Sequence, residues 1–241
     1  MDTTVPREIF DSAYENGTAP WVIGEPQPAV VELERTGAIR GAVLDAGTGA
    51  GEHTIHLAEL GYDVLGVDFS PFAVEQARAN ARARGVEARF EVADALGLGT
   101  QERFDTVLDS ALFHVFGAEE RQRYTRSLHA VCRPGAVVHV LALSDAEPGF
   151  GPRISDQVIR DAFADGWELE DLRPSRYRGI ARGDAAEGSG CPTAARPTSP
   201  PGSRGRAASE PTRAGHADAA GPEQHRRRRV SAVVGSGRPR N

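Results

Sequence analysis

The residues best suited to chemistry lie in one glycine-rich segment, DAGTGAGE at 45–52, between an apolar run at 42–46 and a helical stretch over 51–60. Glycines at 47, 49 and 51 let a ligand approach the backbone and let the turn close tightly before the helix. Asp68 ends the next apolar run, 23 residues after Asp45, so its carboxylate is expected beside the glycines. A carboxylate there can accept hydrogen bonds from both ribose hydroxyls, and the spacing therefore predicts a nucleoside site.

The glycine spacing narrows the kind of nucleoside. The segment reads Gly-x-Gly-x-Gly, and Glu52 follows where the dinucleotide enzymes place other residues. A pyrophosphate would meet the Glu52 carboxylate at a helix N-terminus, where an anion site should be neutral or basic. The sequence favours a nucleoside with a positive centre and disfavours a nicotinamide-dependent oxidoreductase.

The elements that must position these residues alternate between strands and helices. Such a pattern predicts an α/β, Rossmann-like, doubly wound and mainly parallel sheet with helices on both faces. Ligands bind such a sheet at the carboxyl ends of its strands. Strands are expected at 42–46, 63–67, 88–92, 104–109, 136–143 and 167–172, and helices near 28–36, 51–60, 71–84, 119–132 and 155–164.

With a third motif, VADA at 92–95, these segments resemble the class I S-adenosylmethionine-dependent methyltransferases. The resemblance covers about residues 20–172. It implies S-adenosylmethionine as cofactor, with Asp94 near the adenine amino group and Asp45 organising the glycine loop around the methionine end. The residues implied to bind the cofactor are Trp21, Asp45, Gly47, Thr48, Gly49, Gly51, Asp68, Phe69, Asp94, Ala95 and Asp109.

A narrower resemblance concerns YENGTAPWVIGEPQP at 14–28. It looks like the N-terminal lid of thiopurine-methyltransferase-like enzymes and of bacterial relatives that methylate small phenolic, quinol or heterocyclic compounds. By that resemblance Trp21 lies against the cofactor. The alternative is that Trp21 only pins the N-terminal segment onto the core.

The acceptor side is expected in two loops, DSALFH at 109–114 and FGPR at 150–153, each after a predicted strand. Methyl transfer needs chiefly alignment, and a base matters only for acceptors that are not already ionised. His114 is the candidate catalytic residue, as base or orienting group, and Phe113, His114 and Phe150 are the candidate substrate-binding residues. Asp109 either borders the transferring methyl group or caps its own loop.

Composition divides the chain near residue 180. Residues 1–179 hold 17 Arg and 29 acidic residues, a net charge of −12, whereas 180–241 hold 11 Arg and 5 acidic residues, a net charge of +6. Residues 180–241 contain no Leu, Phe, Tyr, Trp or Met, so they bury little apolar surface. We expect a methyltransferase domain at 1–179 and a disordered Ala/Gly/Pro/Arg-rich tail at 180–241. The tail is either a functional basic arm or a frameshifted C-terminus, and the sheet is expected to lack the usual seventh, antiparallel strand.

The leading hypothesis is an enzyme that moves a methyl group from S-adenosylmethionine to an oxygen, sulfur or nitrogen of a small molecule. The alternative is a protein that binds S-adenosylmethionine but is catalytically impaired, because its C-terminal part departs from the family. A nucleic-acid substrate is disfavoured by the acidic domain. No apolar run is long enough to span a bilayer, so no membrane contact is expected. The N-terminal MDTTVPREIF lacks the basic and apolar regions of a secretory signal, so we expect the cytoplasm. We further expect a monomer without a metal.

Overall fold

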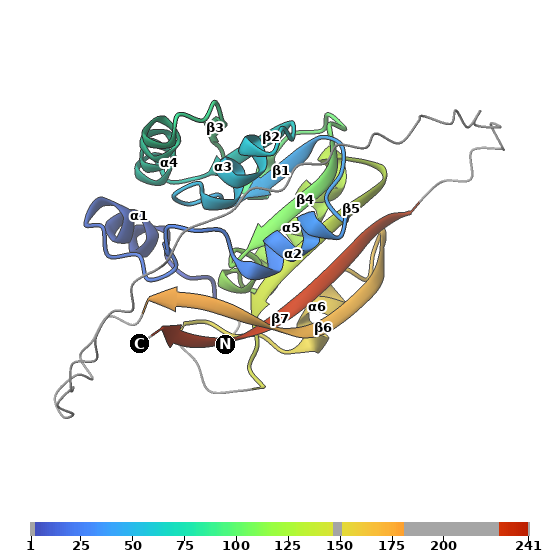
Figure 1. The fold of residues 1–241 in the computed structure, drawn as a ribbon. Helices are drawn as coiled ribbons and strands as arrows, with labels where there is room; N and C mark the ends of the chain where they lie inside the picture. The colour runs from blue at the N-terminus through green and yellow to red at the C-terminus, as the bar shows by residue number, and fades with distance from the viewer. Residues whose placement is uncertain (1–2, 147–150, 181–226, 241) are drawn as a thin grey trace, which may run out of the picture. The chain divides into compact units, whose positions relative to one another are not determined.

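The computed structural model describes residues 3–146, 151–180 and 227–240, with side chains for all but 235–240. These residues belong to one compact unit, Met1–Ala181 with His225–Asn241. Figure 1 shows a central sheet flanked by helices. In the described part of the chain, no helix is both long and apolar enough to cross a membrane.

The sheet contains seven strands in the described residues, in the order β3-β2-β1-β4-β5-β7-β6. Every pair of neighbouring strands runs parallel. The chain order reverses between β1 and β4, and the crevice at such a switch point is where ligands bind. The strands are β1 (Val43–Ala46), β2 (Val64–Asp68), β3 (Arg89–Val92), β4 (Phe104–Ser110), β5 (Cys132–Leu143), β6 (Trp167–Ile180) and β7 (Arg228–Arg240).

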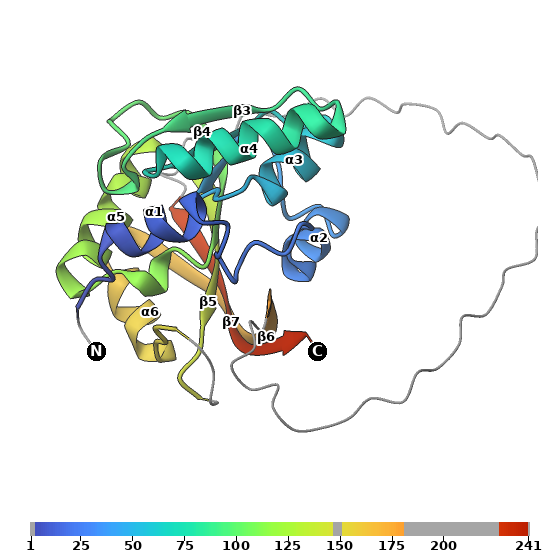
Figure 2. The ribbon, with the colours of Figure 1, turned by 90° about the vertical axis from the view of Figure 1, so that its left-hand side faces the viewer.

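Helices cover both faces of the sheet, as the sequence predicts. Figure 2 shows α5 (Ala118–Val131) and α6 (Asp156–Ala162) on one side of the strands and α2 (Pro28–Arg35) and α3 (Glu52–Glu59) on the other. Apolar side chains of α5 and α6 pack with those of β4, β5 and β7 in the largest core cluster. The helix α4 (Pro71–Arg84) packs with α3 and β3 in a separate cluster.

Local signals set the helix ends. Pro71 occupies the first position of α4, and the Ser70 side chain accepts a hydrogen bond from the Ala73 amide. Gly85 ends the helix in the left-handed conformation, with φ of 68°. All five helices expected from the sequence are present, with ends shifted by a few residues.

A helix that the sequence analysis did not assign, α1 (Arg7–Glu15), precedes the rest of the fold. The segment after it is tied to the end of β6. The Gln27 side chain exchanges two hydrogen bonds with the backbone of Arg178, at 2.8 and 3.0 Å, and the Ile180 amide donates to the Pro20 carbonyl. These contacts fix residues 20–27 above the carboxyl ends of the strands.

The expectation of a missing seventh strand is wrong. Residues 228–240 form β7, which lies between β5 and β6 and runs parallel to both rather than antiparallel (Figure 1). Val230, Ala232 and Val234 alternate into the largest core cluster, so this short run buries enough apolar surface to hold its place. Residues 181–226 lie outside the described residues, and disorder or frameshift there stays a prediction.

Candidate active site

The glycine loop joins β1 to α3 in a conformation that only glycine adopts readily. Gly47, Gly49 and Gly51 have φ of 72°, 55° and 87°. A Cβ on Gly49 would lie 2.5 Å from the Tyr14 hydroxyl oxygen, and a Cβ on Gly51 would lie 2.9 Å from the Ala77 methyl group. The absence of a side chain at Gly49 lets Tyr14 of α1 pack directly on the loop, and its absence at Gly51 lets α3 and α4 pack together.

Asp45 holds this loop rather than facing a ligand. Its Oδ2 accepts hydrogen bonds from the hydroxyls of Thr48 at 2.8 Å and Thr54 at 2.7 Å, and the residue is 1% exposed. The carboxylate thereby ties the loop to the first turn of α3. This geometry agrees with the interpretation that Asp45 organises the glycine loop.

Asp68 lies at the end of β2 beside the glycine loop, as the sequence predicts. Its Oδ2 accepts from the Gly49 amide and its Oδ1 from the Ser70 amide, each at 3.0 Å. Burial raises the pKa of this carboxyl group to about 6, although both hydrogen bonds act in the opposite direction. Each oxygen keeps lone pairs for further donors, and the residue lines the main cavity.

Asp94 follows β3 and lines the same cavity. Its Oδ1 accepts from the Leu96 amide at 2.9 Å, and its Oδ2 accepts from the Arg7 guanidinium at 2.6 Å. Burial opposes ionisation here, but the bonds from Arg7 and Leu96 outweigh it and hold the pKa below its usual value. The Arg7 guanidinium carbon also lies 5.1 Å from the centre of the Phe69 ring, a cation–π distance.

The N-terminal segment forms one wall of the cavity. The Trp21 indole N–H donates to the Tyr14 hydroxyl at 2.7 Å, and the Phe10 ring lies 5.6 Å from the Trp21 ring. Burial, reinforced by the Asp68 charge, raises the pKa of Tyr14 well above its ordinary value, so this phenol stays protonated. Trp21 lines the cavity and also packs beside a cluster formed by Leu141, Leu143 and Tyr177.

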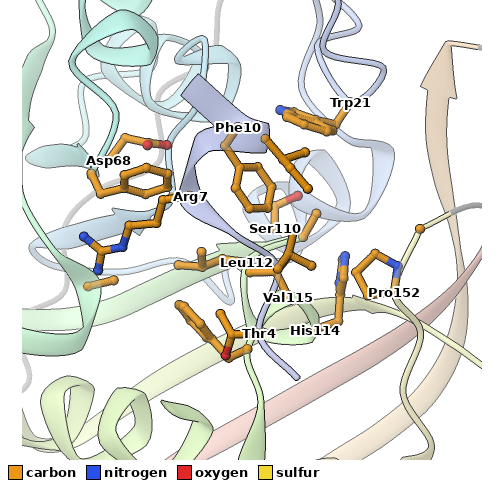
Figure 3. Close-up of a pocket in the computed structure, with 18 of the residues that line it drawn as sticks. Thr4, Arg7, Phe10, Trp21, Asp68, Ser110, Leu112, His114, Val115 and Pro152 are labelled. Carbon is orange, nitrogen blue, oxygen red and sulfur yellow. The ribbon is translucent and has the colours of Figure 1, made fainter. Parts of the chain in front are cut away.

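The cavity has a volume of about 410 Å³, which suits small-molecule ligands. Figure 3 shows Asp68 and Arg7 toward one end, His114 and Pro152 toward the other, and Phe10 and Leu112 between them. A small adjoining chamber is lined by residues 47–50 of the glycine loop together with Glu52 and His53. The geometry therefore joins a polar, nucleoside-type end to an apolar end.

The apolar end is built by the turn after β4, where the short helix η2 spans Phe113–Val115. His114 is 6% exposed, lines the cavity, and accepts a hydrogen bond at Nδ1 from the Leu143 amide at 3.2 Å. Ala111, with φ of 71°, turns the chain so that Leu112, His114 and Val115 face the cavity.

Four of the predicted site residues that the structure describes line neither the cavity nor its adjoining chamber: Asp45, Gly51, Asp109 and Phe113. The Phe113 side chain is fully buried, with its ring 5.5 Å from that of Phe163, because η2 turns it into the core rather than toward the cavity. Asp109 is 1% exposed, and its Oδ1 accepts from the amides of Leu112 and Phe113 at 3.1 Å. It caps the turn, which was the alternative interpretation, rather than bordering the cavity.

The other predicted residues are distributed as follows. The cavity or its adjoining chamber is lined by Trp21, Gly47, Thr48, Gly49, Asp68, Phe69, Asp94, Ala95 and His114. Gly51 packs against α4, and Phe150 lies outside the described residues. The cavity-lining residues that the sequence analysis missed include Arg7, Phe10, Tyr14, Leu143 and Tyr177.

Residues 43–135 match a family described as a methyltransferase domain. The chain is 34% identical over 197 residues to a 2-heptyl-1-hydroxyquinolin-4(1H)-one methyltransferase of Mycobacteroides abscessus, covering 76% of this chain and 86% of that protein. It is 46% identical, with a TM-score of 0.67, to a structure solved in work on the conversion of a disulfide bond into a thioacetal group during echinomycin biosynthesis. That match covers 72% of this chain and 84% of the other.

A third similar protein is the Burkholderia thailandensis 1,6-didemethyltoxoflavin-N1-methyltransferase, whose structure contains 1,6-didemethyltoxoflavin and S-adenosylhomocysteine. The identity is 26%, the TM-score is 0.54, and the match covers 65% of this chain and 75% of that one. The fold, the glycine loop and these relatives agree. The chain belongs to the class I S-adenosylmethionine-dependent methyltransferases that act on small molecules.

Proposed function

We propose that this enzyme methylates a heteroatom of a flat, largely apolar small molecule held beneath its N-terminal segment. The observation that carries the proposal is the single cavity that joins Asp68 and Asp94 at one end to a wall of Leu112, Val115 and His114 at the other. An acceptor in the second part would face the ligand in the first. Methyl transfer requires that adjacency.

The first part of the cavity fits S-adenosylmethionine by its own contacts. Asp68 has lone pairs for the ribose hydroxyls, and Asp94 with Phe69 borders the space for adenine. The glycine loop would take the methionine end, because its residues 47–50 line the chamber that adjoins the cavity. When bound, S-adenosylmethionine supplies an electrophilic methyl group on a sulfonium, whose positive charge suits a site lined by Asp68.

The second part of the cavity is chiefly apolar. Phe10, Trp21, Leu112 and Val115 can hold a ring system and exclude water, while His114 provides a polar contact. The quinolone and toxoflavin relatives are named for heterocyclic substrates, which supports a heterocyclic or phenolic acceptor here.

The chain's own contribution is alignment. Trp21 and Tyr14 close the N-terminal wall through their 2.7 Å hydrogen bond, and Gln27 anchors that wall to β6. Holding two reactants in line accounts for a large share of the rate enhancement of such displacements.

Calorimetry tests the cofactor part of the proposal. S-adenosylmethionine and S-adenosylhomocysteine should bind with measurable heat, whereas NAD should not. A panel of phenols, thiols and 1-hydroxyquinolin-4(1H)-one, followed by mass spectrometry for a methyl adduct, tests the acceptor part.

A matched pair of variants locates the acceptor. Val115→Trp should fill the apolar end and abolish turnover while S-adenosylhomocysteine still binds, because Val115 lies in that part of the wall. Phe72→Trp, on an exposed position of α4, is the control for adding an indole. Full turnover by Val115→Trp would contradict the proposed acceptor position.

We also propose the cytoplasm as the location and a monomer as the working form. The location is supported by Cys132, a buried free thiol on β5, which suits a reducing compartment. The alternative of a catalytically impaired protein rested on a C-terminal part that departs from the family. The strand β7 fills the place of the seventh strand but runs parallel to its neighbours, so the turnover assay decides between the two hypotheses.

A further inference from the structure

His114 is held in one protonation pattern by the backbone of β5. The Leu143 amide donates to its Nδ1 at 3.2 Å, and an amide N–H can only donate. Nδ1 must therefore carry a lone pair and no proton. A neutral imidazole has one N–H, so the proton lies on Nε2.

Burial keeps this ring neutral. It lowers the pKa of His114 to about 4, and burial is the cause of that shift. Ionising the ring would also place a proton on Nδ1 against the Leu143 N–H. Figure 3 shows His114 in the cavity wall between Val115 and Pro152, where Nε2 is the ring nitrogen left for a ligand.

We propose that His114 is a fixed hydrogen-bond donor that holds the acceptor through Nε2–H, and that this enzyme methylates acceptors which enter the cavity as anions. The inference rests on the proposed function. A nitrogen that already carries a proton has no lone pair with which to take another from an acceptor hydroxyl, whereas it binds a phenolate or similar oxyanion well.

The other ionisable groups that line the cavity are Arg7, Tyr14, Asp68, Asp94, Glu120 and Tyr177. Asp94 is paired with Arg7, and Asp68 lies with Arg7 at the end of the cavity opposite His114 (Figure 3). Burial raises the pKa of Tyr14 and of Tyr177, so both are neutral phenols. Glu120, in the first turn of α5, has a buried carboxylate oxygen, Oε2, with no hydrogen-bond partner among the described residues, so it is the alternative base that the experiments below test.

The reaction then needs no proton transfer. The oxyanion supplies the electron pair of the new C–O bond as the C–S bond of the sulfonium breaks and its pair returns to sulfur. The negative acceptor and the positive donor become two neutral centres, so charge balances without a base.

The tautomer can be read directly by nitrogen-15 NMR of the full chain labelled on histidine. His114→Gln identifies the His114 signals among the seven histidines. We expect an unprotonated Nδ1 and a protonated Nε2 from pH 5.5 to 8, with no titration in that range. A protonated Nδ1 would overturn the proposal whether or not turnover is found.

Two variants separate a donor from a base. Gln at position 114 places an amide N–H near the position of Nε2 but has no basic lone pair. Asn can accept from Leu143 but is too short to reach the acceptor. A donor role predicts that His114→Gln has a kcat/KM roughly tenfold or more above that of His114→Asn, measured with 4-nitrophenol at pH 8. Equal and large losses in both variants would indicate a base.

The pH profile provides an independent check. For 4-nitrophenol and 4-methylphenol, the rise of kcat/KM with pH should follow the ionisation of each phenol. If kcat/KM rose with the same pH dependence for both phenols, an enzyme group would control the reaction and the proposal would be overturned. It would also be overturned if Glu120→Gln lost activity toward 4-methylphenol, the less acidic phenol, and kept its activity toward 4-nitrophenol. Binding of S-adenosylhomocysteine is measured in every variant, and its absence in the wild type would count against the proposed function rather than against the role of His114.

Discussion

Asp68 offers the sharpest test of the cofactor site, because its carboxylate links three parts of the structure. It accepts from Gly49 of the glycine loop and from Ser70 at the start of α4, and it lines the cavity where a ribose would bind. In Asp68→Ala all of these acceptors are lost. Hydrogen bonds to a charged group contribute about 1.5–3 kcal/mol, so S-adenosylhomocysteine should bind roughly 10- to 150-fold more weakly.

The pKa of Asp68 makes the prediction more specific. Burial raises this pKa to about 6 in the absence of ligand. Ribose hydroxyls donate to the carboxylate and favour its charged form, so binding should release the proton. Affinity should therefore fall as pH drops below 6, by about tenfold between pH 7 and pH 5, because the proton must first be removed.

Calorimetric titration of S-adenosylhomocysteine at pH 5, 6 and 7 measures both effects. Asp68→Ala should weaken binding at pH 7 and flatten the pH dependence. Glu75→Ala, which removes an exposed carboxylate paired with Arg82 on α4, is the control for charge and should bind as the wild type does. Unchanged affinity in Asp68→Ala, or a tenfold pH effect that survives in it, would refute the assignment.

Three further predictions concern β7, the N-terminal wall and the pH dependence of stability. Val230→Asp should lower the free energy of unfolding in urea by several kcal/mol, since it replaces a fully buried valine with a carboxylate. A urea unfolding curve unchanged by this variant would show that β7 does not stabilise the fold. Trp21→Phe should lower the free energy of unfolding by about 0.5–1.5 kcal/mol, because it removes the hydrogen bond to Tyr14. The double variant with Tyr14→Phe should be little less stable than Trp21→Phe alone, since both substitutions remove the same bond. Burial raises the pKa of Asp109 to about 6, so its contribution to stability is present below pH 4 and is lost as pH rises through 6. The free energy of unfolding should therefore fall by about 3 kcal/mol over this range. Urea denaturation at pH 4 and 7 should show a smaller fall in Asp109→Asn.

The first six strands and five of the helices could be predicted because their signals are local. Apolar β-branched runs mark β1, β2 and β5, and Ser70, Pro71 and Gly85 mark the ends of α4. The helix α1 was missed because it buries no residue fully and borders the cavity rather than the main core. The length of β6 was underestimated, since the strand was expected at 167–172 and continues to Ile180.

The cofactor side was predictable and the acceptor side only partly so. The positions of the three glycines and of Asp68 and Asp94 follow from where the strands end, so the backbone pattern alone predicts them. Phe113 and His114 are neighbours, and which of them faces the cavity depends on the turn at Ala111. Phe10 and Tyr14, four residues apart on one helix face, gave the signal that could have identified the N-terminal wall.

The strand β7 shows why composition misjudged the C-terminal residues. Val230–Val234 is a short run next to four arginines, and by itself it buries too little surface to fold. Between β5 and β6 it gains partners on both sides, and the arginines gain acceptors: Arg228 donates to the Cys132 carbonyl at 2.8 Å and to Glu102 at 2.5 Å, and Arg229 donates to Glu170 at 2.7 Å. A basic run that looks like a solvated tail can thus begin a strand, because its charge is matched by carboxylates on elements distant in sequence. Averages over residues 180–241 do not contain that information, since the partners lie before residue 171.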